Sequence, residues 1–152
     1  MSGPHAGSAA PEPVRPAASA PASSGGRKRV AAATKWAEIV SYSRAVRAGD
    51  AVHVAGTTAV DDDGAVMHAG DPYRQALRAL EIIEGALREL GATRADVVRT
   101  RMFVKDPAHW ESVGRAHGEF FRGIDPAATM VFARLIDDAL LVEIEADAVV
   151  RS

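Results

Sequence analysis

The C-terminal segment carries three carboxylates at a spacing that could support acid–base chemistry. Residues 140–150 read LLVEIEADAVV, in which Glu143, Glu145 and Asp147 occupy every second position. Side chains two residues apart share one face of a β-strand, so the pattern predicts a strand with an acidic face. A glutamate in a partly dry cleft has a raised pKa and can then orient or activate a water molecule. Glu143 is the candidate for this role, and the alternative is a solvated or salt-bridged glutamate.

Arginines on another predicted strand could bind an anionic ligand. Residues 97–104 read VVRTRMFV, and Arg99 and Arg101 alternate there with less polar residues. Both should therefore project from the sheet face opposite to the apolar set. The alternative is that they pair with the acidic residues of a neighbouring strand. Arg44 and Arg134 are lesser candidates for the same task.

A histidine and two threonines complete the set of candidate groups. His117 lies on the apolar stripe of a predicted helix, where its titration range suits a general acid or base. A lone histidine in that position is more often a core or interface residue. Thr57 and Thr58 follow Gly56 in the string VAGTT and could offer hydroxyls and backbone N–H groups to a ligand, or simply end a strand. The five histidines show no metal-ligand spacing, so we expect no metal site.

Composition excludes several classes of function. The chain has 152 residues, a net charge of −2 and no cysteine, which suits one domain without disulfides or a thiol nucleophile. The slightly acidic balance argues against a nucleic-acid-binding surface. No apolar run is long enough to span a bilayer, and the N-terminus lacks the apolar core of a signal peptide. We therefore expect a cytoplasmic protein with no membrane contact.

The first part of the chain differs in composition from the rest. Residues 1–34 are rich in Ala, Pro, Ser and Gly and contain almost no large apolar side chains. Such a segment cannot offset its ordering entropy by burial, so we expect a disordered tail followed by a folded domain over residues 35–152.

The elements that must position the candidate groups follow from turn and capping signals. A Gly49-Asp50 turn joins two strands, and a helix is expected over residues 71–90, with Asp71 as its cap. A second helix is expected from Asp106 to about residue 122, with an inner stripe of Trp110, Val113, His117, Phe120 and Phe121. Two further strands are expected over residues 129–135 and 140–150.

This order predicts a mixed α/β sheet with both helices packed on one face. On the last strand, Val142, Ile144, Ala146 and Ala148 form the side that can meet the helices. The opposite face of the sheet then has no helix to cover it. A subunit of this kind is suited to a symmetric oligomer.

The order of elements and several strings resemble the Rid family, the reactive intermediate deaminases also called YjgF-type proteins. The resemblance covers about residues 36–151 and is carried by SYSRAVRAGD, VAGTT, LGATRADVVRTRMFVKD, VGRAHGEFF and ARLIDDALLVEIEADAV. It implies a chorismate-mutase-like fold and a homotrimer with ligand sites in the clefts between subunits. It also implies hydrolysis of enamines or imines to a keto acid and ammonia, without metal or organic cofactor.

The resemblance also assigns individual residues. It implies that Tyr42 lines the pocket, that the backbone of Gly56 approaches the ligand, and that Glu143 positions a water molecule. The family's substrate-binding arginine should follow Pro126-Ala127, but Ala128 and Thr129 stand there. These two residues would leave room for a different ligand, and Arg101 or Arg99 would be the replacement cation.

These observations favour an enzyme that hydrolyses a small molecule bearing an imine, an enamine or a related group. The alternative is a small-molecule binding protein, or a pathway enzyme such as an isomerase or cyclase, on the same fold. A nucleic-acid enzyme, which older family labels mention, is disfavoured by the net charge.

Overall fold

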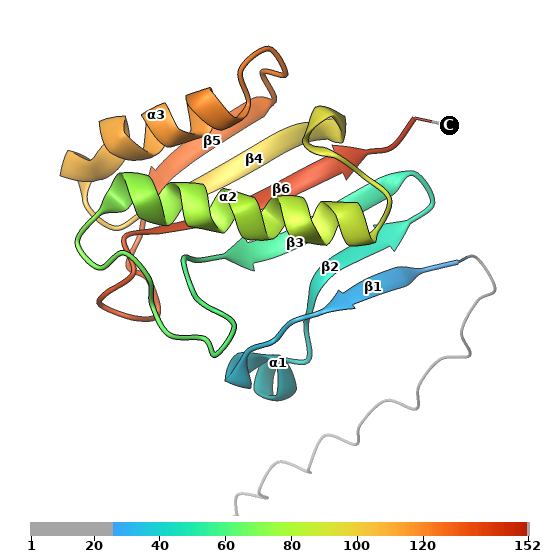
Figure 1. The fold of residues 1–152 in the computed structure, drawn as a ribbon, viewed down its shortest axis with the longest axis horizontal. Helices are drawn as coiled ribbons and strands as arrows, with labels where there is room; N and C mark the ends of the chain where they lie inside the picture. Colours follow the sequence, from blue (N-terminus) through green and yellow to red (C-terminus); the bar gives the residue numbers. More distant parts are fainter. Residues whose placement is uncertain (1–25, 152) are drawn as a thin grey trace, which may run out of the picture.

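The protein forms a six-stranded sheet with two long helices on one face (Figure 1). A computed structural model describes residues 26–151 of the chain, except for the side chains of Lys35, Trp36 and Glu38. In chain order the helices and strands are β1 Lys28–Ala31, α1 Lys35–Val40, β2 Ser43–Ala48, β3 Ala51–Thr57, α2 Pro72–Glu89, β4 Val97–Val104, α3 Trp110–Phe120, β5 Ala127–Phe132 and β6 Val142–Val149. Short 3₁₀ turns at Arg94–Asp96 and Pro107–His109 precede β4 and α3.

The sheet order is β1-β2-β3-β6-β4-β5, in which only β4 and β5 run parallel. The last strand therefore lies in the middle of the sheet, between β3 and β4. The strands β5 and β6 follow one another in the chain but are not neighbours. The mixed α/β sheet with helices on one face confirms the expected fold class.

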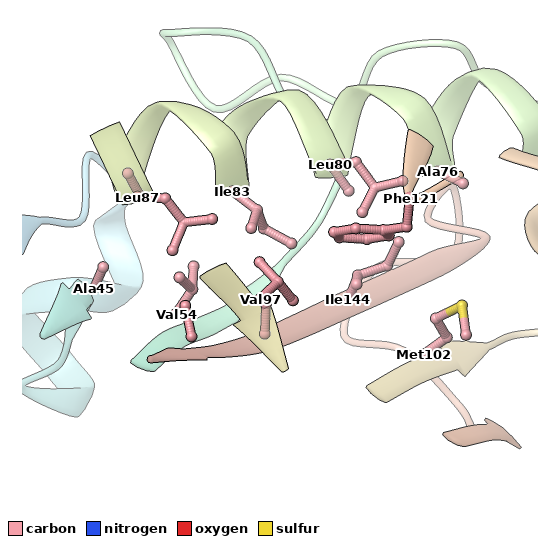
Figure 2. Packing of buried hydrophobic residues seen from close by; sticks show 14 of the residues in the cluster. Ala45, Val54, Ala76, Leu80, Ile83, Leu87, Val97, Met102, Phe121 and Ile144 are labelled. Carbon is pink, nitrogen blue, oxygen red and sulfur yellow. The ribbon is translucent and has the colours of Figure 1, made fainter. Parts of the chain in front are cut away.

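Burial of one side of α2 against the sheet forms the core. Asp71 caps the helix by accepting a hydrogen bond from the Arg74 backbone N–H, and Pro72 occupies the first turn. Figure 2 shows Leu80, Ile83 and Leu87 of α2 directed at side chains of the sheet. The four apolar residues of β6 that were expected to meet the helices are all buried: Val142, Ile144, Ala146 and Ala148.

The structure corrects the expected stripe of α3. Trp110 is 53% exposed, whereas Ala116, which was not on the predicted stripe, is fully buried. The helical part begins only at Trp110, because the Asp106-Pro107 start produces a 3₁₀ turn. Trp110 is therefore the first residue of the helix, where its side chain is largely exposed.

Two strands also differ from expectation. Val98 is 48% exposed and Val97 is buried, because the β4–β6 pairing shifts register between Val97 and Arg99. Residues 28–31, assigned above to the tail, pair with β2 as the edge strand β1. The boundary at residue 34 was therefore wrong. Residues 1–25, where the rest of the expected tail falls, lie outside the described residues.

The segment between β5 and β6 is held by a buried glutamine of α2. The Gln75 amide donates to the Ala139 carbonyl at 2.9 Å and accepts from the Leu141 backbone N–H at 2.8 Å. Gln75 is fully buried and its bond to Leu141 is buried as well, so the Leu141 N–H has no water as a substitute partner. The side chain thereby fixes the start of β6. No helix in the described part of the chain is long and apolar enough to cross a bilayer.

Replacing Gln75 by leucine should destabilise the fold because it leaves the Leu141 N–H buried without a partner and removes the bond to the Ala139 carbonyl. A buried unsatisfied group costs about 1–3 kcal/mol, so we expect a loss of that size in the free energy of unfolding by urea titration. The matched control is Arg74→Leu, since Arg74 is the exposed neighbour and its replacement should change stability by less than about 0.5 kcal/mol. Equal effects of the two substitutions would contradict the assignment.

Candidate active site

A β-bulge in β3 shapes the candidate site. Val54 pairs with Ala146 and Thr57 pairs with Ile144, so β3 has one residue more than β6 in this interval. The extra residue turns Thr57 toward the core, where it is 1% exposed. It also leaves Ala55 and Gly56 beside the acidic face of β6, which is the usual effect of a bulge on the strand that carries it.

Gly56 allows the carboxylate of Glu143 to lie against the backbone of β3. A Cβ atom built on Gly56 would lie 2.0 Å from Glu143 Oε1 and 3.0 Å from its carboxyl carbon. Any other residue at this position would therefore have to displace the carboxylate. This explains why the VAGTT string has glycine in its centre.

Glu143 and Gly56 line a cavity of about 600 Å³. The cavity lies on the side of β2, β3 and β6 away from α2, and it extends to the segments that follow β3 and precede β6. Besides Glu143 and Gly56, its polar walls include Thr34, Tyr42, Arg44, Thr58, Asp63 and Asp137. Its apolar walls include Ala33, Val40, Ala55, Val60, Val66, Ile136 and Leu140.

The environment of Glu143 favours its protonated form. Partial burial raises the pKa of the Glu143 carboxyl above its ordinary value, and the nearby charge of Glu145 raises this pKa further. The positive charge of Arg44 acts in the opposite direction and offsets part of the rise. A carboxyl group with a raised pKa in a cavity can exchange a proton with a ligand or a water molecule near neutral pH.

Arg44 is the cation that the structure brings to this carboxylate. Its Nη1 donates to the Gly56 carbonyl and to Thr57 Oγ1, both at 2.9 Å. Its guanidinium lies 6.0 Å from the centre of the Tyr42 ring. The sequence analysis gave Arg44 less weight than Arg99 and Arg101. Its two-residue spacing from Tyr42 was the signal for it, because alternate residues near a strand share a face.

The other pocket residues expected from the sequence lie in different situations. Tyr42 lines the cavity, and its hydroxyl is 2.9 Å from Thr34 Oγ1. Thr58 also lines the cavity. Thr57 does not, because its hydroxyl donates to the Ala55 carbonyl at 2.7 Å and accepts from Arg44. The expectation that Thr57 offers its hydroxyl to a ligand was therefore wrong.

Arg99 and Arg101 are on the predicted face of β4 but do not reach the cavity. Arg101 Nη1 lies 3.6 Å from Glu145 Oε2 and 3.4 Å from Asp147 Oδ2, which is the alternative given above. Arg99 is opposite Asp147 in the β4–β6 register and is exposed. Neither arginine therefore serves as the replacement cation within this chain.

His117 is on the opposite side of the sheet from Glu143. Its Nε2 lies 2.8 Å from Thr100 Oγ1, and Thr100 is fully buried on the helix side of β4. The ring also packs 4.8 Å from that of Phe121, and burial lowers the pKa of His117. The structure therefore corrects the catalytic assignment of His117, which is a core residue with a satisfied hydrogen bond.

Ala128 and Thr129 are on the edge strand β5, two strands away from β6. They pair with Thr100 and Arg101 of β4, both are exposed, and neither lines the cavity. The segments at residues 58–66 and 136–140 supply much of the cavity wall, and of their residues only Thr58 was predicted to belong to the site. Their loop conformation is set by contacts far apart in the sequence, such as those of Gln75, and has no local signal.

Comparison with known proteins gives the family of the chain. Residues 32–150 match the family model described as Endoribonuclease L-PSP. A crystal structure from Mycobacterium tuberculosis, a member of the YjgF/YER057c/UK114 family, is 46% identical with a TM-score of 0.74, covering 82% of this chain and all of that one. The chain belongs to the Rid, or YjgF, family.

Two curated relatives support membership of the Rid family. An uncharacterised protein of Streptomyces coelicolor is 38% identical over 122 residues, which are 80% of this chain and 90% of that protein. A RutC family protein of Pyrococcus abyssi is 31% identical over 107 residues, which are 70% of this chain and 84% of that one. The Rid framework thus covers most of the described residues.

The site contains groups for proton transfer and anion binding. Within residues 26–151, no cluster of three or more His, Cys, Asp or Glu side chains could hold a metal ion. A carboxyl group, a guanidinium and a phenol converge on the cavity instead. Their chemistry suits the binding and protonation of a small polar group.

Gly56→Ala should displace the Glu143 carboxylate while leaving the sheet intact, because the clash falls on the end of a side chain. We expect the pKa of Glu143, followed by carboxyl NMR, to return toward about 4.3 as the group moves into solvent. Gly118→Ala is the matched control, since a Cβ there meets no atom within 4 Å. An unchanged Glu143 pKa in Gly56→Ala would show that the close approach does not set it.

Glu143→Gln should stabilise the protein at neutral pH. A carboxyl whose pKa is raised by folding favours the folded state below its unfolded pKa, and this advantage is lost as the pH rises through the folded pKa. The amide avoids the cost of the ionised form, so we expect a gain below about 1 kcal/mol at pH 7 because Glu143 is partly solvated. The gain should vanish below about pH 4, where Glu143 is protonated in both states. Urea titrations at both pH values measure this, and a gain at low pH alone would contradict it.

Proposed function

We propose that the protein is a hydrolase of small molecules that bear an imine, an enamine or a related group. The observation that carries the proposal is the Glu143 carboxylate, held against Gly56 in the cavity with a raised pKa. Membership of the Rid family supports the same chemistry. In this proposal no metal or organic cofactor takes part.

In the proposed reaction the imine reacts in its protonated form, the iminium ion, which an enamine reaches by taking a proton at carbon. The Glu143 carboxylate orients a water molecule and accepts one of its protons as the oxygen bonds to the iminium carbon, which gives a neutral carbinolamine. Glu143 returns this proton to the nitrogen, the C–N bond breaks to release ammonia, and the hydroxyl group gives its proton to solvent as the carbonyl forms. A carboxyl group with a raised pKa in a cavity can both accept and return a proton.

We propose that the working form is a homotrimer with its sites in clefts between subunits. The sheet face away from α2 and α3 carries Glu145, Asp147 and Arg101 together with exposed Val131 and Val149. At the cavity, Val40 is 64% exposed and Ile136 is 69% exposed. A second subunit that covers these apolar side chains would exclude water from the cavity.

Glu143→Gln should abolish release of ammonia from enamines generated in the assay from amino acids, because glutamine cannot exchange the required proton. We expect a loss of at least about 100-fold in kcat, the usual contribution of a general acid–base group. Glu111→Gln is the matched control, since it makes the same change at an exposed glutamate of α3 that does not line the cavity. Unchanged turnover in Glu143→Gln would overturn the assigned role.

The absence of a guanidinium at residues 127–129 supports a second candidate, a non-hydrolytic binding protein or an isomerase or cyclase. In that case the same cavity would bind a metabolite without consuming water. The measurements that favour it are thermal stabilisation by metabolites together with no release of ammonia from any enamine.

A further inference from the structure

The guanidinium of Arg44 has the features of a prepared anion site. Its described hydrogen bonds use Nη1 alone, and both acceptors are neutral oxygens, the Gly56 carbonyl and Thr57 Oγ1. Thr57 is itself fixed through its bond to the Ala55 carbonyl. The side chain is thus held in place, while the donors on Nη2 and Nε have no partner among the described residues. A guanidinium offers five donors, and two adjacent ones match a carboxylate.

Five other arginines in the described residues have partners that occupy them. Arg78, Arg88, Arg94 and Arg101 each lie within 4.0 Å of a carboxylate oxygen. Arg47 donates to the Gly49 and Leu90 carbonyls. Arg44 is in none of the ion pairs among the described residues. Of the described residues that line the cavity, it is the only Lys, Arg or His. A positive charge at that place favours an anionic ligand.

The walls around Arg44 and Glu143 indicate the rest of the ligand. Five aliphatic side chains larger than alanine line the cavity: Val40, Val60, Val66, Ile136 and Leu140. The ring of Tyr42 adds an aromatic surface. A volume of about 600 Å³ is in the range of pockets that take ligands well above the size of a small amino acid. A ligand with a bulky apolar body would fill this space.

We propose that Arg44 binds the carboxylate of the substrate, and that the substrate is a carboxylate-bearing imine or enamine with an aliphatic or aromatic body. The identity of the reacting group in this inference rests on the proposed function. The binding of the carboxylate by Arg44 does not. Arg44 and Glu143 both contact Gly56, one at its carbonyl and the other at its Cα side. The carboxylate and the reacting carbon are therefore expected to be close together in the ligand.

Binding of a carboxylate at Arg44 should couple to the protonation of Glu143. Arg44 lowers the pKa of Glu143, so a bound negative charge that offsets Arg44 should raise this pKa. Proton uptake on binding should follow at a pH near the pKa of the free site. Calorimetry in buffers of different ionisation enthalpy measures this uptake, which should disappear in Glu143→Gln. Carboxylate binding without uptake would place the anion away from Glu143 and overturn the proposed geometry.

The test of the anion site uses two probes of the same shape, 3-phenylpropanoate and its neutral amide. We expect the full-length protein to bind the carboxylate about tenfold or more tightly than the amide, because a charge-assisted bidentate contact is lost with the amide. Arg44→Gln should lower the affinity for the carboxylate by about tenfold and leave that for the amide unchanged. Arg44→Lys keeps the charge without the planar fork and should retain a reduced preference.

Arg99→Gln is the matched control, since it removes the same charge from an exposed arginine that does not line the cavity. It should leave the preference for the carboxylate unchanged. The preference of the unaltered protein should also fall as the salt concentration rises, a readout that needs no variant to fold. Equal affinity for both probes, no binding of the carboxylate, or an unchanged preference in Arg44→Gln would overturn the inference.

Failure of this inference is distinguishable from failure of the proposed function. Glu143→Gln should lose release of ammonia but keep the preference for the carboxylate probe. Ammonia release by a protein without that preference would refute the role of Arg44 alone. Carboxylate preference in a protein that releases no ammonia from any enamine would refute the hydrolase alone.

Discussion

The site depends on the close approach of the Glu143 carboxylate to the backbone of Gly56. A Cβ on Gly56 would lie 2.0 Å from Glu143 Oε1, so the two strands can carry this carboxylate only with glycine at that position. The same residue supplies the carbonyl that accepts from Arg44. The bulge that places Gly56 on the open face also turns Thr57 inward, where it holds Arg44 from the other side. One extra residue in β3 thus determines where both the Glu143 carboxylate and the Arg44 guanidinium lie.

Much of the fold could be predicted from local patterns. The alternation along β6 is strict, and its two faces are separated in the structure as the residue types require. The cap at Asp71 and the apolar stripe of α2 fix that helix in the same way. The predictions failed where pairing between distant strands decides the outcome. The register shift at Val98 and the separation of β5 from β6 by β4 have no local signal, because each depends on which strand becomes the neighbour.

The site could be predicted only in part, for the same reason. Tyr42, Gly56 and Glu143, which line one cavity, could be assigned to one site only through the family resemblance, since they are far apart in the sequence. Periodicity placed Arg99 and Arg101 on the correct face of β4, but a face spans several strands, and β6 lies between them and the cavity wall formed by β2 and β3. For His117 the predicted helix face was correct, but that face packs against the core of the sheet and not against the cavity.

The lack of a direct ion pair between Arg44 and Glu143 among the described contacts affects the chemistry of the site. A direct ion pair would use the donors of Arg44 and hold the pKa of Glu143 low, which would remove both an anion site and a proton carrier. Within the described residues the two groups form no such pair, and they are related through Gly56 instead. Burial then raises the pKa of Glu143 more than Arg44 lowers it. A framework that has no arginine at residues 127–129, the start of β5, can therefore still combine a cation and a proton-exchanging carboxyl in one cavity.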